Sequence, residues 1–120
     1  IGLLSAGVLN LNNMRDIESD KLSNKQTLAG YFGPKRAKTY QQLLVIVAML
    51  LIGLYSFLIA NSTVYFVLIA FVPLLLHLNI IRKIKTPIEY DPQLKALALS
   101  TVSSSLNLFL LYFSPSRVNK

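Results

Sequence analysis

The sequence contains no cysteine, which excludes disulfide frameworks, thiolate metal sites and cysteine nucleophiles. It is also poor in charge: charged residues make up 14% of the chain, whereas a soluble domain carries about 25%. The scarcity is greatest in residues 43–81, where no Lys, Arg, Asp or Glu occurs. A stretch of that length and composition cannot form the surface of a water-soluble protein, so the sequence indicates a membrane protein.

Apolar residues are abundant instead, at 53% of the 120 residues. They form four segments, and a helix is predicted for each because an open strand cannot satisfy its backbone hydrogen bonds in lipid. The segments cover residues 1–13, 43–60, 64–81 and 96–113. Each of the last three would form roughly 27 Å of helix, close to the hydrocarbon thickness of a bilayer. The predicted fold class is therefore all-α, a polytopic transmembrane helix bundle.

The first apolar segment begins at Ile1 with no basic region before it, unlike a signal peptide. We interpret it as the end of a membrane helix, and residues 1–120 as the C-terminal part of a single transmembrane domain. Turn signals support the predicted boundaries of other helices. Gly33 and Pro34 predict a break before the second segment, and Asp91 followed by Pro92 predicts an N-cap before the last one.

The net charge of +7 comes mostly from basic residues that flank the apolar segments. They gather in two polar loops, residues 14–39 and 82–95, whereas residues 61–63 form a short neutral turn. Because basic loops stay on the inner side, both polar loops are predicted to be cytoplasmic, in a multi-pass protein of the cell's inner (plasma) membrane. The charge is thus explained by the lipid bilayer as partner, and nucleic acid is not an expected partner.

Three oxygen-bearing side chains, Asn12, Asp16 and Asp20, follow the first apolar segment at a spacing of four residues. If the helix continues, they share one face at its cytoplasmic end. Stacked carboxylates repel each other, so the pattern makes sense if a divalent cation lies between them. Mg²⁺ is expected because it combines a few carboxylates with substrate phosphate. The residues that could bind that phosphate are the nearby Arg15, Lys21 and Lys25.

Several of these polar residues allow a plainer interpretation. The charges after the first segment could be ordinary solvated surface at a membrane interface. His77 lies in the third apolar segment, where it could face a substrate cavity, although packing between helices is the commoner role. Glu89 and Asp91 are interpreted as solvated or helix-capping groups, with a role near a substrate as the alternative.

Residues 12–29, NNMRDIESDKLSNKQTLA, resemble the second aspartate-rich motif of the UbiA superfamily of intramembrane prenyltransferases. The similarity is greatest to members that act on 1,4-dihydroxy-2-naphthoate in menaquinone biosynthesis, whose pattern is Asn-Asn-x-Arg-Asp-x-x-x-Asp followed by Gly-Lys-x-Thr-Leu. The chain departs at Asn24, where the family usually has glycine, although asparagine also tolerates the left-handed backbone region. The matching residues are Asn12, Asn13, Arg15, Asp16, Asp20, Lys25, Thr27 and Leu28.

The resemblance implies a Mg²⁺-dependent enzyme whose helices surround a central cavity, with two aspartate-rich motifs that bind the metal and a polyprenyl diphosphate. The implied reaction transfers the polyprenyl group to 1,4-dihydroxy-2-naphthoate with loss of diphosphate and CO₂, forming demethylmenaquinone. The first aspartate-rich motif is absent from these residues, so the chain alone is expected to be inactive. The implied site residues are Asp16, Asp20 and Asn12 for the metal, and Lys25, Arg15 and Lys21 for the diphosphate.

Other functions fit parts of the same pattern. A relative within the family could use another aromatic acceptor, such as 4-hydroxybenzoate or homogentisate. A non-enzymatic transporter segment could use Asp16 and Asp20 as an ion site, but transport sites usually lie near the bilayer midplane rather than at its edge. A purely structural membrane anchor gives no reason for stacked carboxylates beside lysines.

Overall fold

The computed structural model describes residues 1–59 and 64–112. The regular structure in these ranges is entirely helical, which confirms the predicted all-α class. The elements are α1 (Gly2–Arg15), α2 (Ile17–Leu22), α3 (Leu28–Ile59), α4 (Val64–Lys83), η1 (Pro87–Glu89) and α5 (Tyr90–Tyr112). The predicted neutral turn at residues 61–63 lies outside the described residues, as do residues 60 and 113 at the ends of two predicted segments.

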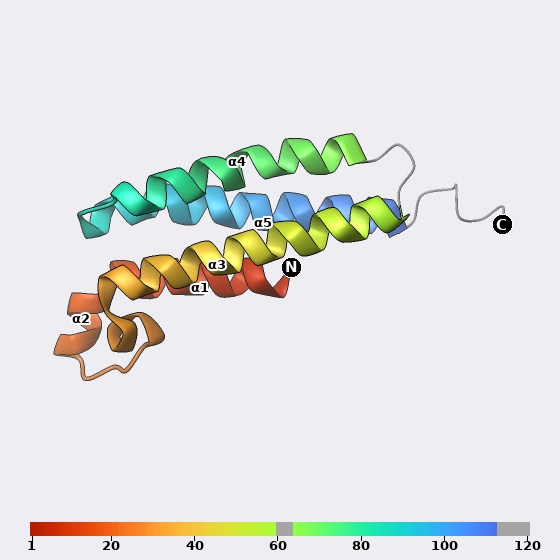
Figure 1. The fold of residues 1–120 in the computed structure, drawn as a ribbon. Helices are drawn as coiled ribbons and strands as arrows, with labels where there is room; N and C mark the ends of the chain where they lie inside the picture. Colours follow the sequence, from red (N-terminus) through yellow and green to blue (C-terminus); the bar gives the residue numbers. More distant parts are fainter. Residues whose placement is uncertain (60–63, 113–120) are drawn as a thin grey trace.

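The four long helices lie alongside one another in an elongated bundle (Figure 1). α1 packs against α3 and α5, and α4 packs against the same two helices. The short elements α2 and η1 lie at the same end of the bundle, at the left of Figure 1. The two regions predicted to be cytoplasmic therefore meet at one end of the molecule.

The interior of the bundle is built from apolar side chains on the facing sides of the helices. Leu4 and Leu11 of α1, Val45 of α3, Leu74 of α4 and Leu97 of α5 are fully buried in one cluster. Removing such side chains from solvent is the main favourable term in holding helices together in water, whereas close packing has that role in lipid. The cluster fixes how α1 sits against its neighbours, and so where the end of α1 lies.

The outward faces of the long helices are also apolar. Phe57 on α3 is 79% exposed and Leu99 on α5 is 71% exposed, whereas soluble monomers rarely expose large contiguous apolar patches. Within the described residues, one helix, Leu28–Leu58, is long and apolar enough to cross a membrane. The span predicted at residues 43–60 falls on this helix, and membrane crossing by α1, α4 and α5 stays a prediction.

The prediction of a loop at residues 14–39 is wrong, because most of this range is helical. α1 continues to Arg15, and both α2 and the start of α3 lie inside the range. The break predicted at Gly33 is confirmed, since Gly33 adopts φ 75° and ψ 167° within α3 and Pro34 follows it. The prediction of a loop rests on the many charged residues in this range. Charged residues also occur in helices at the end of a bundle, where one helix face is in contact with water.

The second polar loop, predicted at residues 82–95, is also shorter than expected. α4 extends to Lys83, a single 3₁₀ turn covers Pro87–Glu89, and α5 begins at Tyr90. Asp91 therefore lies inside the first turn of α5, and the predicted N-cap role is wrong. Its carboxylate instead contacts the end of α1.

Candidate metal and diphosphate site

The aspartate motif lies at the junction between α1 and α2 and not on one continuous helix. Asp16 departs from helical geometry, with φ −96° and ψ 10°. The backbone spacing nevertheless persists: the Asp16 N–H donates to the Asn12 carbonyl at 3.1 Å, and the Asp20 N–H donates to the Asp16 carbonyl at 2.8 Å. The three residues therefore lie in successive turns, as their spacing predicts, with one irregular residue among them.

Arg15 connects three oxygen-bearing side chains, which come from α1, from the junction after α1 and from α5. Its Nε and Nη2 donate to the two carboxylate oxygens of Asp16 at 2.8 and 3.2 Å. Nη2 also donates to Asn12 Oδ1 at 2.9 Å, and Nη1 donates to Asp91 Oδ1 at 2.9 Å. The guanidinium thus links the end of α1 to the first turn of α5.

These contacts change the acid–base properties of both partners. The hydrogen bonds from Arg15 hold the pKa of Asp16 below its ordinary value, and the positive charges of Arg15 and Lys25 act in the same direction. The hydrogen bonds to Asp16 and Asp91 in turn raise the pKa of Arg15. Asp16 is therefore an ionised carboxylate at neutral pH, which is the form that binds a cation.

Asp20 is the most buried of the predicted metal ligands, with 7% of its surface exposed. Lys25 Nζ donates to its Oδ1 at 3.0 Å. Its second oxygen, Oδ2, is buried and has no hydrogen-bond partner. An unpaired buried acceptor is destabilising. A cation bound to Oδ2 would remove that cost, so this oxygen is the candidate cation ligand of the motif.

The turn after α2 determines where Lys25 lies. Asn24 adopts the left-handed backbone conformation, with φ 55°. The N–H groups of Asn24 and Lys25 donate to the carbonyls of Lys21 and Asp20, at 3.2 and 2.8 Å, which is the Schellman pattern of helix ends. The chain is thereby folded back onto the last turn of α2, and the Lys25 side chain reaches Asp20. Asparagine here forms the turn for which glycine is the usual residue.

The same loop starts α3 and borders a surface pocket. The Thr27 hydroxyl accepts a hydrogen bond from the Gly30 N–H at 3.2 Å, as an N-cap does. Lys21 and Lys25 line a pocket of about 700 Å³ together with other residues of the loop and of the first turn of α3. Two of the predicted diphosphate ligands therefore share one pocket, whereas the third, Arg15, is held at Asp16.

A second polar cluster lies inside the bundle, with one buried side chain from each long helix: Asn10, Gln41, His77 and Gln93. Asn10 Nδ2 donates to Gln41 Oε1 at 2.9 Å, and Gln41 Nε2 lies 3.3 Å from His77 Nε2. His77 Nδ1 lies 2.9 Å from Gln93 Oε1. Because an amide oxygen only accepts, His77 carries its proton on Nδ1 and accepts from Gln41 at Nε2. The interpretation of His77 as a helix-packing residue is confirmed.

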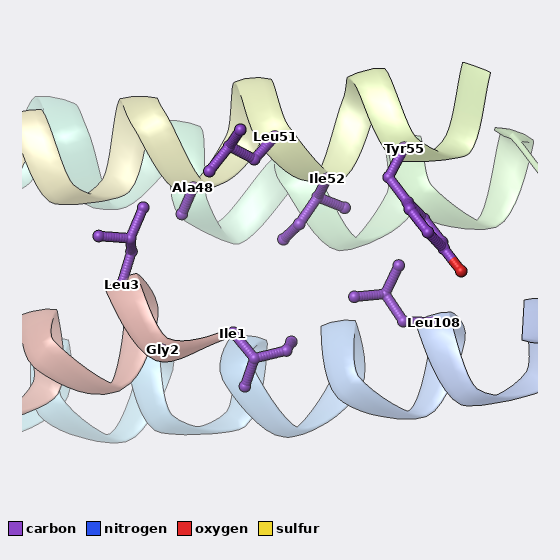
Figure 2. Close-up of a pocket in the computed structure, with 8 residues that line it drawn as sticks. All are labelled: Ile1, Gly2, Leu3, Ala48, Leu51, Ile52, Tyr55 and Leu108. Carbon is purple, nitrogen blue, oxygen red and sulfur yellow. The ribbon is translucent and has the colours of Figure 1, made fainter. Parts of the chain in front are cut away.

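An apolar pocket of about 610 Å³ lies at the opposite end of α1 from the aspartate motif (Figure 2). Side chains of α3 lie on one side of it, and the start of α1 and Leu108 of α5 lie on the other; Tyr55 contributes a hydroxyl. The lining residues are Ile1, Gly2, Leu3, Ala48, Leu51, Ile52, Tyr55 and Leu108. A polar site and an apolar pocket thus lie along one helix, about 20 Å apart by its rise per residue.

The chain matches a known protein family. Residues 1–102 match the model of the UbiA prenyltransferase family. The chain belongs to the UbiA prenyltransferase family. Members of the UbiA family are integral membrane proteins, which accounts for the apolar outward faces of the helices. The resemblance of residues 12–29 to this family is therefore confirmed.

Two curated UbiA relatives are similar over most of this chain. It is 33% identical over 108 residues to 1,4-dihydroxy-2-naphthoate octaprenyltransferase of Haemophilus influenzae, covering 89% of this chain and 34% of that protein. It is 29% identical over 111 residues to the Escherichia coli protein of the same name, covering 92% of this chain and 36% of that protein. The chain thus spans about a third of the length of these relatives. No solved structure matches it.

The resemblance to UbiA enzymes implies a Mg²⁺ ion, and the residues at the junction of α1 and α2 can be compared with the ligands that Mg²⁺ prefers. Asp16 and Asp20 supply the hard oxygen ligands that Mg²⁺ prefers, and the unpaired Asp20 Oδ2 fits such a role. In the parts of the chain that the structure describes, no group of three or more His, Cys, Asp or Glu side chains is arranged to hold a metal. Asp16 and Asp20 would therefore supply two of the ligands of a Mg²⁺ site, and the described residues alone do not complete one.

From the sequence, a role near a substrate is only an alternative for Asp91 to a solvated or capping role, and the contact of Asp91 with Arg15 is not predicted. Asp91 lies 76 positions from Arg15 along the chain, and no local spacing rule connects them. A signal was present, because Asp91 and Pro92 mark the start of the last helix on the same predicted side of the membrane as the aspartate motif. The signal was interpreted as a helix cap, since capping is the common role of aspartate before proline.

Proposed function

We propose that the protein transfers a polyprenyl group from a polyprenyl diphosphate to 1,4-dihydroxy-2-naphthoate, with Mg²⁺ bound at the junction of α1 and α2. The observation that supports the proposal most directly is the difference between the two carboxylate oxygens of Asp20. One of its carboxylate oxygens is bound by Lys25, and the other is buried without a partner. A cation ligand beside a lysine-lined pocket suits a metal–diphosphate complex. The acceptor is the one in the name that both curated relatives share.

The residues divide into two groups by chemistry. The proposed metal ligands are Asp16, Asp20 and Asn12, and the proposed diphosphate ligands are Lys25, Arg15 and Lys21. When bound, Mg²⁺ supplies a positive charge that stabilises the negative charge developing on the leaving diphosphate. The basic side chains bind the diphosphate oxygens with charge-assisted hydrogen bonds and keep the leaving group in place.

The proposed reaction breaks the carbon–oxygen bond of the prenyl diphosphate, and the electron pair leaves with the diphosphate. The ring carbon that bears the carboxylate attacks the allylic cation, and a carbon–carbon bond forms. The carboxylate then leaves as CO₂ and returns its electron pair to the ring, which gives demethylmenaquinone in its reduced form. The apolar pocket beside Ile52 and Tyr55 lies at the far end of α1 from the diphosphate site and suits the tail of the isoprenoid chain.

We also propose that α1, α3, α4 and α5 are spans of a multi-pass protein of the inner membrane. The exposed apolar side chains on α3 and α5 support this proposal. The basic residues Arg82 and Lys83 end α4 at the same end of the bundle as α2. That end would face the cytoplasm under the positive-inside rule.

The test is prenyl transfer by the gene-encoded protein in membranes, with octaprenyl diphosphate and either 1,4-dihydroxy-2-naphthoate or 4-hydroxybenzoate. We expect product with the naphthoate, loss of product when EDTA removes divalent cations, and recovery when Mg²⁺ is added. Product with 4-hydroxybenzoate alone would contradict the proposed acceptor. Turnover that persists in EDTA would contradict the metal role. Residues 1–120 expressed alone are expected to be inactive.

A further inference from the structure

Arg15 occupies the oxygens that the proposed function assigns to a metal ion. Its guanidinium is hydrogen bonded to both carboxylate oxygens of Asp16 and to Asn12 Oδ1. A guanidinium and a divalent cation compete for such oxygens, because both satisfy the same lone pairs and the same negative charge. A metal that binds Asp16 must therefore displace Arg15 from at least part of this contact.

Asp91 offers Arg15 a partner that does not depend on Asp16. The two carboxylates are bonded to different nitrogens: Nε and Nη2 face Asp16, whereas Nη1 faces Asp91 Oδ1 at 2.9 Å. The fork of an arginine is rigid and planar, so one edge can be released while the other stays bonded. Asp91 is half exposed and sits on α5, a different helix from the motif.

We propose that Asp91 is a positioning residue that holds the Arg15 guanidinium when a divalent cation takes its place on Asp16. Held in this way, Arg15 stays beside the metal and binds the diphosphate that arrives with it. The inference rests on the proposed function, because it assumes that Asp16 is a metal ligand. It explains how one arginine can be both the counter-charge of the metal-free site and a ligand of the substrate.

Asp91 is distinguished from its neighbour Glu89 by its contacts. Glu89 accepts hydrogen bonds from the Thr86 hydroxyl and the Lys85 N–H, at 2.6 and 3.1 Å, both within its own turn. Asp91 bonds across to Arg15 on α1. Glu89→Gln therefore removes the same negative charge from the same region without changing the partner of Arg15, and it serves as the matched control.

The experiment measures Mn²⁺ binding by electron paramagnetic resonance, with and without inorganic diphosphate, on the gene-encoded protein in detergent. We expect Asp91→Asn to weaken Mn²⁺ binding on the order of threefold to tenfold. Arg15 then has only Asp16 and Asn12 as partners, so it competes more strongly with Mn²⁺ for the oxygens of Asp16. Arg15→Gln removes the competitor, so Asp91→Asn should have no further effect in the Arg15→Gln background. Glu89→Gln should bind Mn²⁺ within twofold of wild type.

The outcomes separate this inference from the proposed function. Equal Mn²⁺ affinity in wild type and Asp91→Asn would overturn the inference alone, as would a loss of the same size in the Arg15→Gln background. A wild-type protein that binds no Mn²⁺, even with diphosphate, would instead overturn the proposed metal site. A merely structural role of Asp91 would lower the yield of folded protein without the coupling between Asp91 and Arg15.

Discussion

At Asn24, one backbone angle determines where a side chain of the site lies. Within the described residues, Asn24 is the one non-glycine residue with a positive φ. Asparagine tolerates this conformation because its short polar side chain can bond locally, whereas other side chains with a Cβ lose about 1–2 kcal/mol there. The left-handed turn in turn brings Lys25 to Asp20.

We predict that Asn24→Gly leaves the free energy of unfolding within about 0.5 kcal/mol of wild type, because glycine adopts positive φ freely. Asn24→Val should lower it by about 1–2 kcal/mol, because a β-branched residue is strained there. Denaturation in mixed detergent micelles measures both. Gln26→Val, in the same exposed loop without a positive φ, is the control and should change little. Equal stability of Asn24→Val and Asn24→Gly would contradict the strain.

The individual site residues differ in how well the sequence predicts them. The spacing of Asn12, Asp16 and Asp20 is a local property, and the structure keeps it through backbone hydrogen bonds. The partner of Arg15 is a long-range property, because Asp91 reaches it only through the packing of α5 on α1. Their assignment to metal and diphosphate stays a prediction.

At the scale of helices, the buried polar cluster aligns the four long helices with one another. Each of its four side chains comes from a different helix, so a slip of α3 or α4 by one turn would break two of the cluster's hydrogen bonds, and a slip of α1 or α5 would break one. His77 is the central member, since it bonds to Gln41 on α3 and to Gln93 on α5. The cluster therefore fixes the register of α4, and through Gln41 and Asn10 that of α1.

We predict that His77→Leu lowers the free energy of unfolding by roughly 1–3 kcal/mol, because Gln41 and Gln93 each lose a buried hydrogen-bond partner. His77→Gln should lose less, since its amide can both donate and accept. Unfolding in detergent again provides the measurement. Asn79→Leu, at an exposed position of the same helix, controls for replacing a polar residue with leucine. A His77→Leu variant as stable as Asn79→Leu would contradict the register role.

The apolar parts of the long helices are predicted from the sequence, whereas their polar ends and the short helices are not. Apolar length alone identifies the helical segments that became α1, α3, α4 and α5, because a run of that kind has few alternatives. α2 and η1 are short and charged, so their sequences favour helix and loop about equally. In the structure α2 packs against α1 and α3, and η1 packs against α1 and α5, contacts that no local pattern encodes.

At the scale of the whole molecule, charge and apolar surface define its orientation. The ends of α1 and α4, together with α2 and η1, lie at one end of the bundle (Figure 1). That end carries Arg82 and Lys83 as well as the lysines beside the aspartate motif. Its basic character favours the cytoplasmic side, where a soluble aromatic acceptor and diphosphate would be exchanged.

We predict that Ser23→Cys, at the end of α2, and Ile88→Cys, in η1, are both labelled from the cytoplasmic side by a membrane-impermeant maleimide. The chain has no cysteine of its own, and both positions are exposed. Labelling is compared in inverted vesicles and intact spheroplasts, with Ser62→Cys as the position expected on the opposite side. Labelling of Ser23→Cys and Ile88→Cys from different sides would contradict the bundle orientation.

The central claim is that Asp16 and Asp20 hold the metal that binds the prenyl diphosphate. Its most direct test compares prenyl transfer to 1,4-dihydroxy-2-naphthoate by the gene-encoded protein with that of Asp16→Ala and Asp20→Ala. Glu18→Ala is the control, because Glu18 is an exposed acid on the same short helix. We predict losses on the order of 100-fold or more for the two aspartates, and near-normal rates for Glu18→Ala, at equal amounts of membrane-inserted protein. Near-normal rates for Asp16→Ala and Asp20→Ala would show that neither carboxylate is needed to hold a catalytic metal and would contradict this claim.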